Sequence, residues 1–189
     1  QPPVRRSSGP VGNRRLMALY SFEGRSPRIA KSAFVHDSAQ IIGDVNIGGE
    51  CFIGAGAIIR GDYGAVIVGP RTAIEEGCLV HAAPLSACEI GSSVTVGHGA
   101  IVHCSKVGDF ATIGMGAVVS IGSTVGEWAI VGECSLVTVK GVIPPRKIAV
   151  GIPAKLIGDV TAEHQKMWEL GKQIYVDLCQ RYREGLKKL

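Results

Sequence analysis

The sequence predicts an all-β fold, a left-handed parallel β-helix of hexapeptide repeats, with one α-helix at its C-terminal end. Aliphatic residues recur every six positions over most of the chain, and this period fits neither an α-helix nor an alternating strand. Glycine is abundant, at 26 of 189 residues, whereas aromatic residues make up only 5%. That composition favours repeated tight turns over a core of large rings. From Thr161 onward the pattern changes to helical spacing.

A six-residue unit forms one side of a triangular coil, so three units, about eighteen residues, return the chain to its starting side. We predict that the repeated aliphatic residue points inward and stacks on its counterpart in the next coil. Crossovers between the parallel strands of such a fold run left-handed, against the usual rule. The predicted inward residues are Val35, Ile41, Ile47, Ile53, Ile59, Val68, Ile74, Val80, Ile90, Val96, Val102, Val107, Ile113, Val119, Val125, Val131 and Val137.

Three segments are predicted along the chain. Residues 1–16 are rich in Pro, Ser, Gly and Arg, show no repeat and precede Met17, so we expect a leader that is disordered or left from an expression vector. Residues 17–160 form the β-helix domain, and residues 161–189 form a helix that packs on it. Four arginines of the leader account for the net charge of +4, so no nucleic-acid partner is expected.

The C-terminal helix has a predicted start and a predicted inner face. Thr161 is a suitable N-cap, and Glu163 adds an acidic residue to the first turn. An aliphatic stripe at helical spacing is expected to pack along the outside of the coils, antiparallel to their axis. The residues of that stripe are Met167, Leu170, Ile174 and Leu178.

Cysteine usage and hydropathy bear on the compartment. The six cysteines include no C-x-x-C pair, so a disulfide framework is not expected and a reducing cytoplasm is favoured. Cys51 and Cys78 occupy a small corner position of the repeat, where Cys serves as an apolar filler. Cys104 is outside that position. No apolar run approaches the length of about 18 residues that suggests a membrane span.

Two histidines fall in register on neighbouring coils. His81 and His103 each follow an inward valine, and the count of repeat units between them predicts that they stack about 5 Å apart. Arg60 falls in the same column, one coil before His81. Two imidazoles at this separation can bind one metal ion.

A third histidine lies on a different side of the triangle. His98 belongs to the preceding repeat unit and cannot easily reach the His81 and His103 pair of its own chain. A homotrimer would bring His98 of one chain to the pair of the next, giving three equivalent sites. Three histidines suit Zn2+, with Fe2+ or Co2+ as alternatives, and such an ion lowers the pKa of bound water to about 7.

The chain resembles the γ-class carbonic anhydrase family of hexapeptide-repeat proteins, including its branch found in phenylacetate and carnitine operons. The likeness extends from Tyr20 to Tyr182. Its motifs are Gly43-Asp44-Val45, Arg60-Gly61-Asp62, Arg71-Thr72, Val96-Gly97-His98-Gly99-Ala100, His103, Gly114-Met115-Gly116 and Gly151-Ile152-Pro153-Ala154-Lys155.

The resemblance implies roles for seven residues. It makes His81, His98 and His103 the metal ligands, and Arg60 and Asp62 an ion pair between subunits beside the metal. Tyr175, on the C-terminal helix, matches a tyrosine near the metal; packing at the interface is its alternative role. Family members often carry Asn and Gln where this chain has Ala73 and Glu75, and a carboxylate at Glu75 would raise the pKa of the metal-bound water.

Hydration of carbon dioxide to bicarbonate, a lyase reaction, is the leading functional expectation, with only this small-molecule substrate and copies of the same chain as partners. The alternative enzyme is a coenzyme A thioesterase or acyltransferase that uses the metal-bound hydroxide or one histidine as a base. Against it, no basic, aromatic-bearing insertion for the nucleotide is evident. A metal-binding trimer that acts as a scaffold is the third reading.

Overall fold

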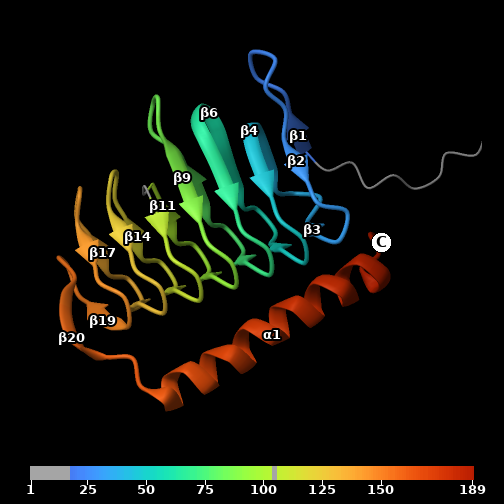
Figure 1. The fold of residues 1–189 in the computed structure, drawn as a ribbon. Helices are drawn as coiled ribbons and strands as arrows, with labels where there is room; N and C mark the ends of the chain where they lie inside the picture. Colours follow the sequence, from blue (N-terminus) through green and yellow to red (C-terminus); the bar gives the residue numbers. More distant parts are fainter. Residues whose placement is uncertain (1–17, 104–105) are drawn as a thin grey trace, which may run out of the picture.

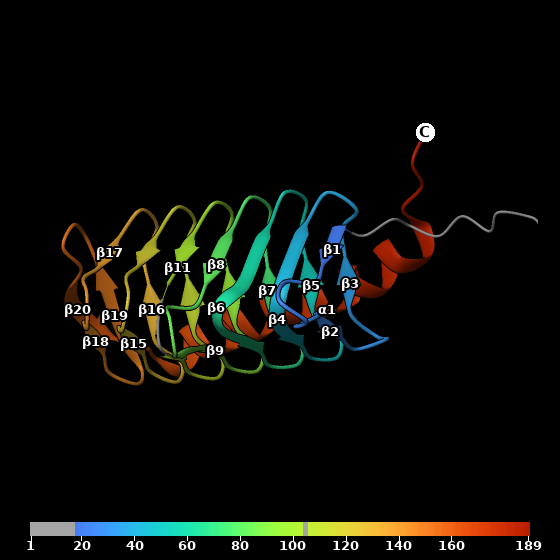
Figure 2. The same cartoon turned by 90° about the horizontal axis from the view of Figure 1, so that it is seen from above.

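Short strands and tight turns alternate along the chain and wind it into a parallel β-solenoid of about seven turns, with one long helix along its side (Figures 1 and 2). The structure, a computed structural model, describes residues 18–103 and 106–189. The predicted leader, Met17 and Cys104 lie outside these ranges. The predicted left-handed β-helix with a C-terminal helix is confirmed.

Successive coils stack their three sides into three faces, each a column of parallel strands. The histidine face comprises β1 (Ala18–Tyr20), the first halves of β4 (Gln40–Ile47) and β6 (Ile58–Val68), β8 (Leu79–His81), β11 (Ile101–Val102), β14 (Val118–Val119) and β17 (Leu136–Val137). The open face comprises β2 (Arg28–Ile29), the second halves of β4 and β6, β9 (Ala87–Ile90), β12 (Lys106–Val107), β15 (Thr124–Val125) and β18 (Val142–Ile143).

The third column is the helix face, which the C-terminal helix covers. Its strands are β3 (Phe34–Val35), β5 (Phe52–Ile53), β7 (Ala73–Ile74), β10 (Thr95–Val96), β13 (Thr112–Ile113), β16 (Ile130–Val131), β19 (Lys147–Val150) and the antiparallel β20 (Lys155–Asp159). This face ends the solenoid, since β20 leads directly into α1 (Ala162–Gly185).

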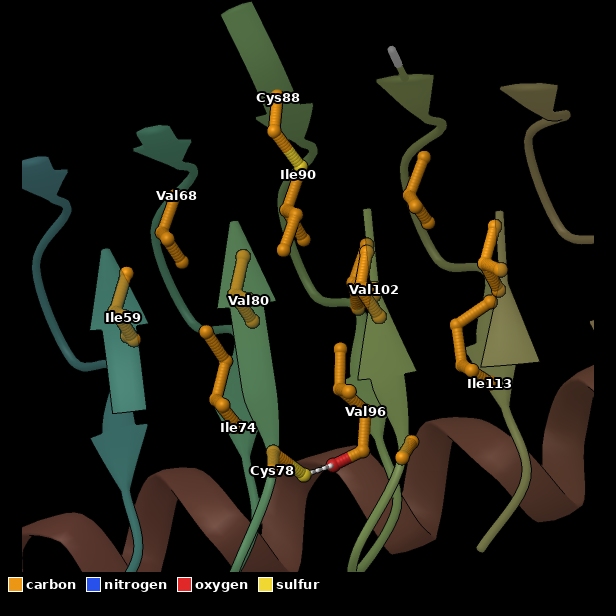
Figure 3. Close-up of a cluster of buried hydrophobic side chains, with 14 of the residues drawn as sticks. Ile59, Val68, Ile74, Cys78, Val80, Cys88, Ile90, Val96, Val102 and Ile113 are labelled. Atoms are coloured by element: carbon orange, nitrogen blue, oxygen red, sulfur yellow. Dashed lines mark hydrogen bonds between the residues drawn. The ribbon is translucent and has the colours of Figure 1, made fainter. Parts of the chain in front are cut away.

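The predicted inward residues form the core. Each of them is at most 3% exposed, and Figure 3 shows Ile59, Val80 and Val102 repeating one position on successive coils. Cys51 and Cys78 are fully buried among them, as fillers. Burial raises the pKa of the Cys78 thiol to about 12, so this group stays protonated and unreactive.

The helix begins as predicted but turns a different face inward. Thr161 caps it, since its hydroxyl accepts from the backbone N–H of His164 at 3.2 Å, and the helix runs back toward β3 (Figure 1). The expected aliphatic stripe was wrong: Met167, Leu170 and Ile174 are 57–64% exposed.

The inward face is instead aromatic and polar, because the helix face offers rings and threonines rather than an aliphatic groove. Phe34 and Phe52 stack at 5.4 Å, and Tyr182 meets both rings edge-on. Leu178 is the member of the predicted stripe that packs on this cluster. Lys172 and Cys179 are the buried residues of the helix.

Two further expectations concern compartment and membranes. None of the five described cysteines takes part in a disulfide, and within the described ranges no helix, α1 included, combines the length and the apolar character needed to cross a bilayer. A cytoplasmic location stays a prediction.

Candidate functional site

Two histidines and an ion pair meet on the histidine face, at the bend within β6 and at the ends of β8 and β11. The β6 strand carries Arg60 and Asp62 on either side of Gly61, where it bends toward the open face. A side chain at Gly61 would overlap the backbone of Asp44 on the previous coil, so the bend requires glycine. Arg60 is paired in register with His81.

His81 is held by both members of the ion pair. A guanidinium can only donate, so Arg60, whose Nη2 lies 3.4 Å from Nδ1 of His81, assigns Nδ1 as the acceptor. Nε2 then carries the proton and donates to Oδ1 of Asp62 at 3.0 Å. Arg60 and Asp62 are themselves 3.2 Å apart. Burial opposes the charge on Asp62, but the bond from His81 and the charge of Arg60 prevail and lower its pKa.

His103 stacks on His81 as the register predicts, with ring centroids 4.8 Å apart and planes 30° apart. Its Nε2 is buried and has no hydrogen-bond partner among the described residues. Burial, followed by the nearby His81 and Arg60, lowers the pKa of His103. The ring is therefore neutral at neutral pH, so one of its two nitrogens carries a lone pair.

A second cluster lies where the helix face meets the helix. Glu75 is 4% exposed, and its Oε2 lies 3.1 Å from Nε2 of His98. Nδ1 of His98 lies 2.8 Å from Oε2 of Glu76, so carboxylates take both ring nitrogens. Burial and then the bond to Glu75 raise the pKa of Tyr175. The structure thus brings Glu75, His98 and Tyr175 together, apart from His81 and His103.

These contacts bear on the expected metal centre. Within residues 18–103 and 106–189, no three side chains of His, Cys, Asp or Glu come together to hold an ion. Of the three expected ligands, only His103 presents a ring nitrogen without a partner; His81 and His98 would each have to leave a carboxylate. The described residues of a single chain therefore do not form a zinc site, and the intersubunit site for Zn2+, Fe2+ or Co2+ stays a prediction.

Two residues near these clusters were missed. Tyr63 is 62% exposed, and its ring lies 6.3 Å from that of His81; it directly follows the Arg60-Gly61-Asp62 motif, which could have pointed to it. Lys172 is 5% exposed. Its spacing with Tyr175 and Cys179 would have marked the inward face had the search not been confined to aliphatic residues.

Comparison with known proteins places the chain. No protein-family model matches the sequence. The carnitine operon protein CaiE of Salmonella agona is 37% identical over 172 residues, which cover 91% of this chain and 87% of that protein. The chain belongs to the CaiE-like hexapeptide-repeat family. The CaiE protein of Escherichia coli K12 is 36% identical over 170 residues.

Two solved structures are similar to this member of the family. A hexapeptide transferase family protein from Anaplasma phagocytophilum is 32% identical, with a TM-score of 0.84, covering 89% of this chain and 99% of that one. A proposed acetyltransferase of Bacillus cereus is 38% identical, with a TM-score of 0.85, covering 87% and 96%.

These relatives correct the expected activity. The hexapeptide-repeat resemblance is confirmed, but carbonic anhydrase, a lyase, was the wrong expectation, because the solved relatives are a transferase and a proposed acetyltransferase. The three-histidine pattern had suggested hydration of carbon dioxide. In this hexapeptide-repeat chain two of those histidines are bound to carboxylates, and the relatives favour the alternative, acyl transfer.

Proposed function

We propose that this protein is an acyltransferase that moves an acyl group from a coenzyme A thioester to a small amine or alcohol. The observation that carries the proposal is the buried Nε2 of His103, which has no hydrogen-bond partner in the described part of the chain. A neutral imidazole with a free nitrogen is the ordinary general base for such a transfer. The transferase relatives support the same reaction class.

His103 takes the proton and returns it. A ring nitrogen of His103 removes the proton from the acceptor as the acceptor's nitrogen or oxygen attacks the thioester carbonyl, which forms the new acyl bond and a tetrahedral intermediate. The intermediate collapses, the carbon–sulfur bond breaks, and the imidazolium protonates the departing thiolate. The acceptor thereby gains the acyl group, and coenzyme A leaves as the thiol.

The other three side chains position this base. Asp62 and Arg60 fix the tautomer and orientation of His81, and the His81 ring supports that of His103 at 4.8 Å. The Arg60 side chain is 43% exposed, so its charge can also favour negative charge on the thioester oxygen. Catalytic hydrogen bonds often tighten only when the substrate is bound.

Hexapeptide-repeat proteins are commonly trimers, and we propose that this chain forms a homotrimer through the histidine face. An outward column of that face is apolar and, in the described part of the chain, is half-buried or exposed. The column consists of Ile58, Leu79, Ile101, Val118 and Leu136, paired in register. Leu79 and Ile101 are 37% and 42% exposed, and a second copy packed there would remove them from water.

Acetyl coenzyme A consumption with a panel of small amines and alcohols tests the activity, with release of the thiol as the readout. We expect acceptor-dependent release in the wild type and a loss of about 100-fold to 10,000-fold in His103→Ala. His36→Ala is the matched control, because His36 is bonded to Ser38, away from the site. Equal rates in all three proteins would contradict the proposal, and release without an acceptor would indicate thioester hydrolysis instead.

Metal analysis separates the activity from the predicted ion. If Zn2+, Fe2+ or Co2+ binds between subunits, His98→Ala and His103→Ala should lose the metal to the same extent, because each ion needs both. Metal retained by either variant would contradict that site and leave the histidine base in place.

A further inference from the structure

Six residues with left-handed backbone stack at one corner of the solenoid, where the open face turns into the helix face. Their φ values lie between +53° and +60°, a region that L residues seldom adopt. The residues are Glu50, Arg71, Ser93, Phe110, Trp128 and Arg146. We call this column the corner ladder. The equivalent position at the next corner is glycine in four successive coils, at Gly56, Gly77, Gly99 and Gly116.

Each step of the corner ladder is one coil tall. Backbone N–H groups of Ser93, Phe110 and Trp128 donate to the coil before, each at 2.9 Å. The rings of Phe110 and Trp128 are stacked with centroids 4.7 Å apart and planes 5° apart. The height of one step of the corner ladder is therefore close to the separation of two stacked aromatic rings.

Ser93 leaves a gap of two steps between Arg71 and Phe110. Its side chain is too short to fill its own level, so Phe110 is covered by Trp128 on one side only. Two coil spacings amount to about 9–10 Å, and a planar ring in contact on both sides needs about 7–8 Å. The gap has room for one flat ring between the guanidinium and the phenyl group.

A cavity occupies this gap, and the C-terminal helix forms one of its walls. Its volume is about 370 Å³, and its walls are Arg71, Ser93, Phe110, Glu169, Lys172, Gln173 and Val176. That size lies within the range of small-molecule sites, about 300–1,000 Å³. Because residues of both the corner ladder and the helix form the gap, no contiguous sequence motif predicts it.

Some polar groups that line the cavity already have hydrogen-bond partners in the protein, and others do not. Lys172 donates to Thr95, Ala111 and Thr112, and Gln173 is bonded to Arg71 and Asp177. Ser93 is 8% exposed, yet its hydroxyl has no hydrogen bond to any residue that the structure describes, and the same holds for the Glu169 carboxylate. One donor hydroxyl and one acceptor carboxylate are therefore open to a ligand.

We propose that this cavity binds the adenine base of a nucleotide. The base would stack between Phe110 and the Arg71 guanidinium, both of which are established partners for base faces. Its exocyclic amino group would donate to Glu169, and a ring nitrogen would accept from the Ser93 hydroxyl. A base without an amino group cannot donate to the Glu169 carboxylate and loses that hydrogen bond, which lowers affinity.

The inference goes beyond the proposed acyl transfer and does not rest on it, since free adenosine tests it without an acyl donor. It also removes the sequence-based objection to a nucleotide ligand. A basic and aromatic site exists, and it is built from the ladder and the helix rather than from an insertion.

Calorimetric titration of the full chain with adenosine is the test, with inosine, which lacks the amino group, as the comparison ligand. We expect saturable adenosine binding to the wild type and at least about fivefold weaker binding of inosine. Phe110→Asn keeps a residue that tolerates the left-handed backbone and removes the ring, so it should weaken adenosine binding about fivefold to a hundredfold. Ser93→Leu should fill the gap with a larger side chain and so weaken adenosine binding.

Arg146→Asn is the matched control, on the same ladder but outside the cavity, and should bind adenosine as the wild type does. The proposal is overturned if adenosine does not saturate the wild type, if inosine binds equally well, or if Arg146→Asn loses as much affinity as Phe110→Asn. Pyrophosphate that competes for the same site would also overturn it, because binding would then follow the phosphates. The inosine comparison uses only the wild type and stands even if a variant fails to fold.

Discussion

Replacing Lys172 by Met should change how the stability of this protein depends on pH. The Lys172 ammonium lies under the helix, where it meets only neutral oxygens of Thr95, Thr112 and the Ala111 carbonyl. The Trp168 ring, 5.6 Å away, favours the charged form. Burial nevertheless prevails and lowers the pKa of Lys172 to about 7, against a smaller opposing effect of Glu75.

The size of the effect follows from linkage between proton binding and folding. In the unfolded chain Lys172 keeps its ordinary pKa of 10.5. Between pH 7 and 10.5 the unfolded state therefore binds more protons, and the free energy of unfolding rises with pH by at most about 1.4 kcal/mol per unit. From pH 7 to pH 9 this amounts to about 2 kcal/mol. Met has no proton to bind, so the variant lacks this rise.

Urea unfolding followed by circular dichroism at pH 7, 8 and 9 measures the difference. The hydrogen bonds that Met cannot make lower the stability of the variant equally at every pH, so the slope is the informative quantity. Lys166→Met, at an exposed position of the same helix, should keep the wild-type slope. If the free energies of unfolding of the wild type and of Lys172→Met change in parallel with pH, burial does not force Lys172 toward its neutral form. That result would refute the reasoning.

Three other changes test the fold and the assembly. Phe52→Ala should lower the free energy of unfolding by about 3–5 kcal/mol, because Phe52 is 1% exposed beneath the helix; a loss below about 1 kcal/mol in urea unfolding would argue against tight packing there. Gly64→Ala should destabilise the chain strongly, since the added Cβ would overlap carbonyl oxygens of the next turn, whereas Gly158→Ala meets nothing; equal melting temperatures would contradict this. Ile101→Arg should dissociate the proposed trimer in sedimentation experiments, and an intact trimer would exclude the histidine face as its interface.

The solenoid could be predicted from the sequence because its rule is local and repeated. An inward aliphatic residue every six positions fixes the register of each coil on the next. The same count predicted that His81 lies beside His103 and that Arg60 lies beside His81. The helix lacked such a rule. Its aliphatic stripe was the most hydrophobic pattern, but the surface it had to match presented Phe52 and buried threonines, which select tyrosine and lysine.

The chemistry of the site was less predictable than its position. The repeat register places Asp62 near His81 and Glu75 near His98. It does not predict which ring nitrogen each carboxylate contacts. Those bonds depend on side-chain torsions that no periodicity encodes. Because of these bonds, only His103 of the three histidines keeps a ring nitrogen without a partner among the described residues. The reaction that these side chains can support changes accordingly.

The returning helix alters how the solenoid can come apart. Stacked coils touch only their neighbours, so an array of this kind opens progressively from either end. Here Cys179 and Arg183 donate to the Ser32 carbonyl in the first coils, whereas the other end of the same helix is continuous with the last coil. Fraying at one end is therefore coupled to the other, which makes the unfolding of the array cooperative. During synthesis, the first coils also wait for the last residues of the chain before their exposed aromatic rings are covered.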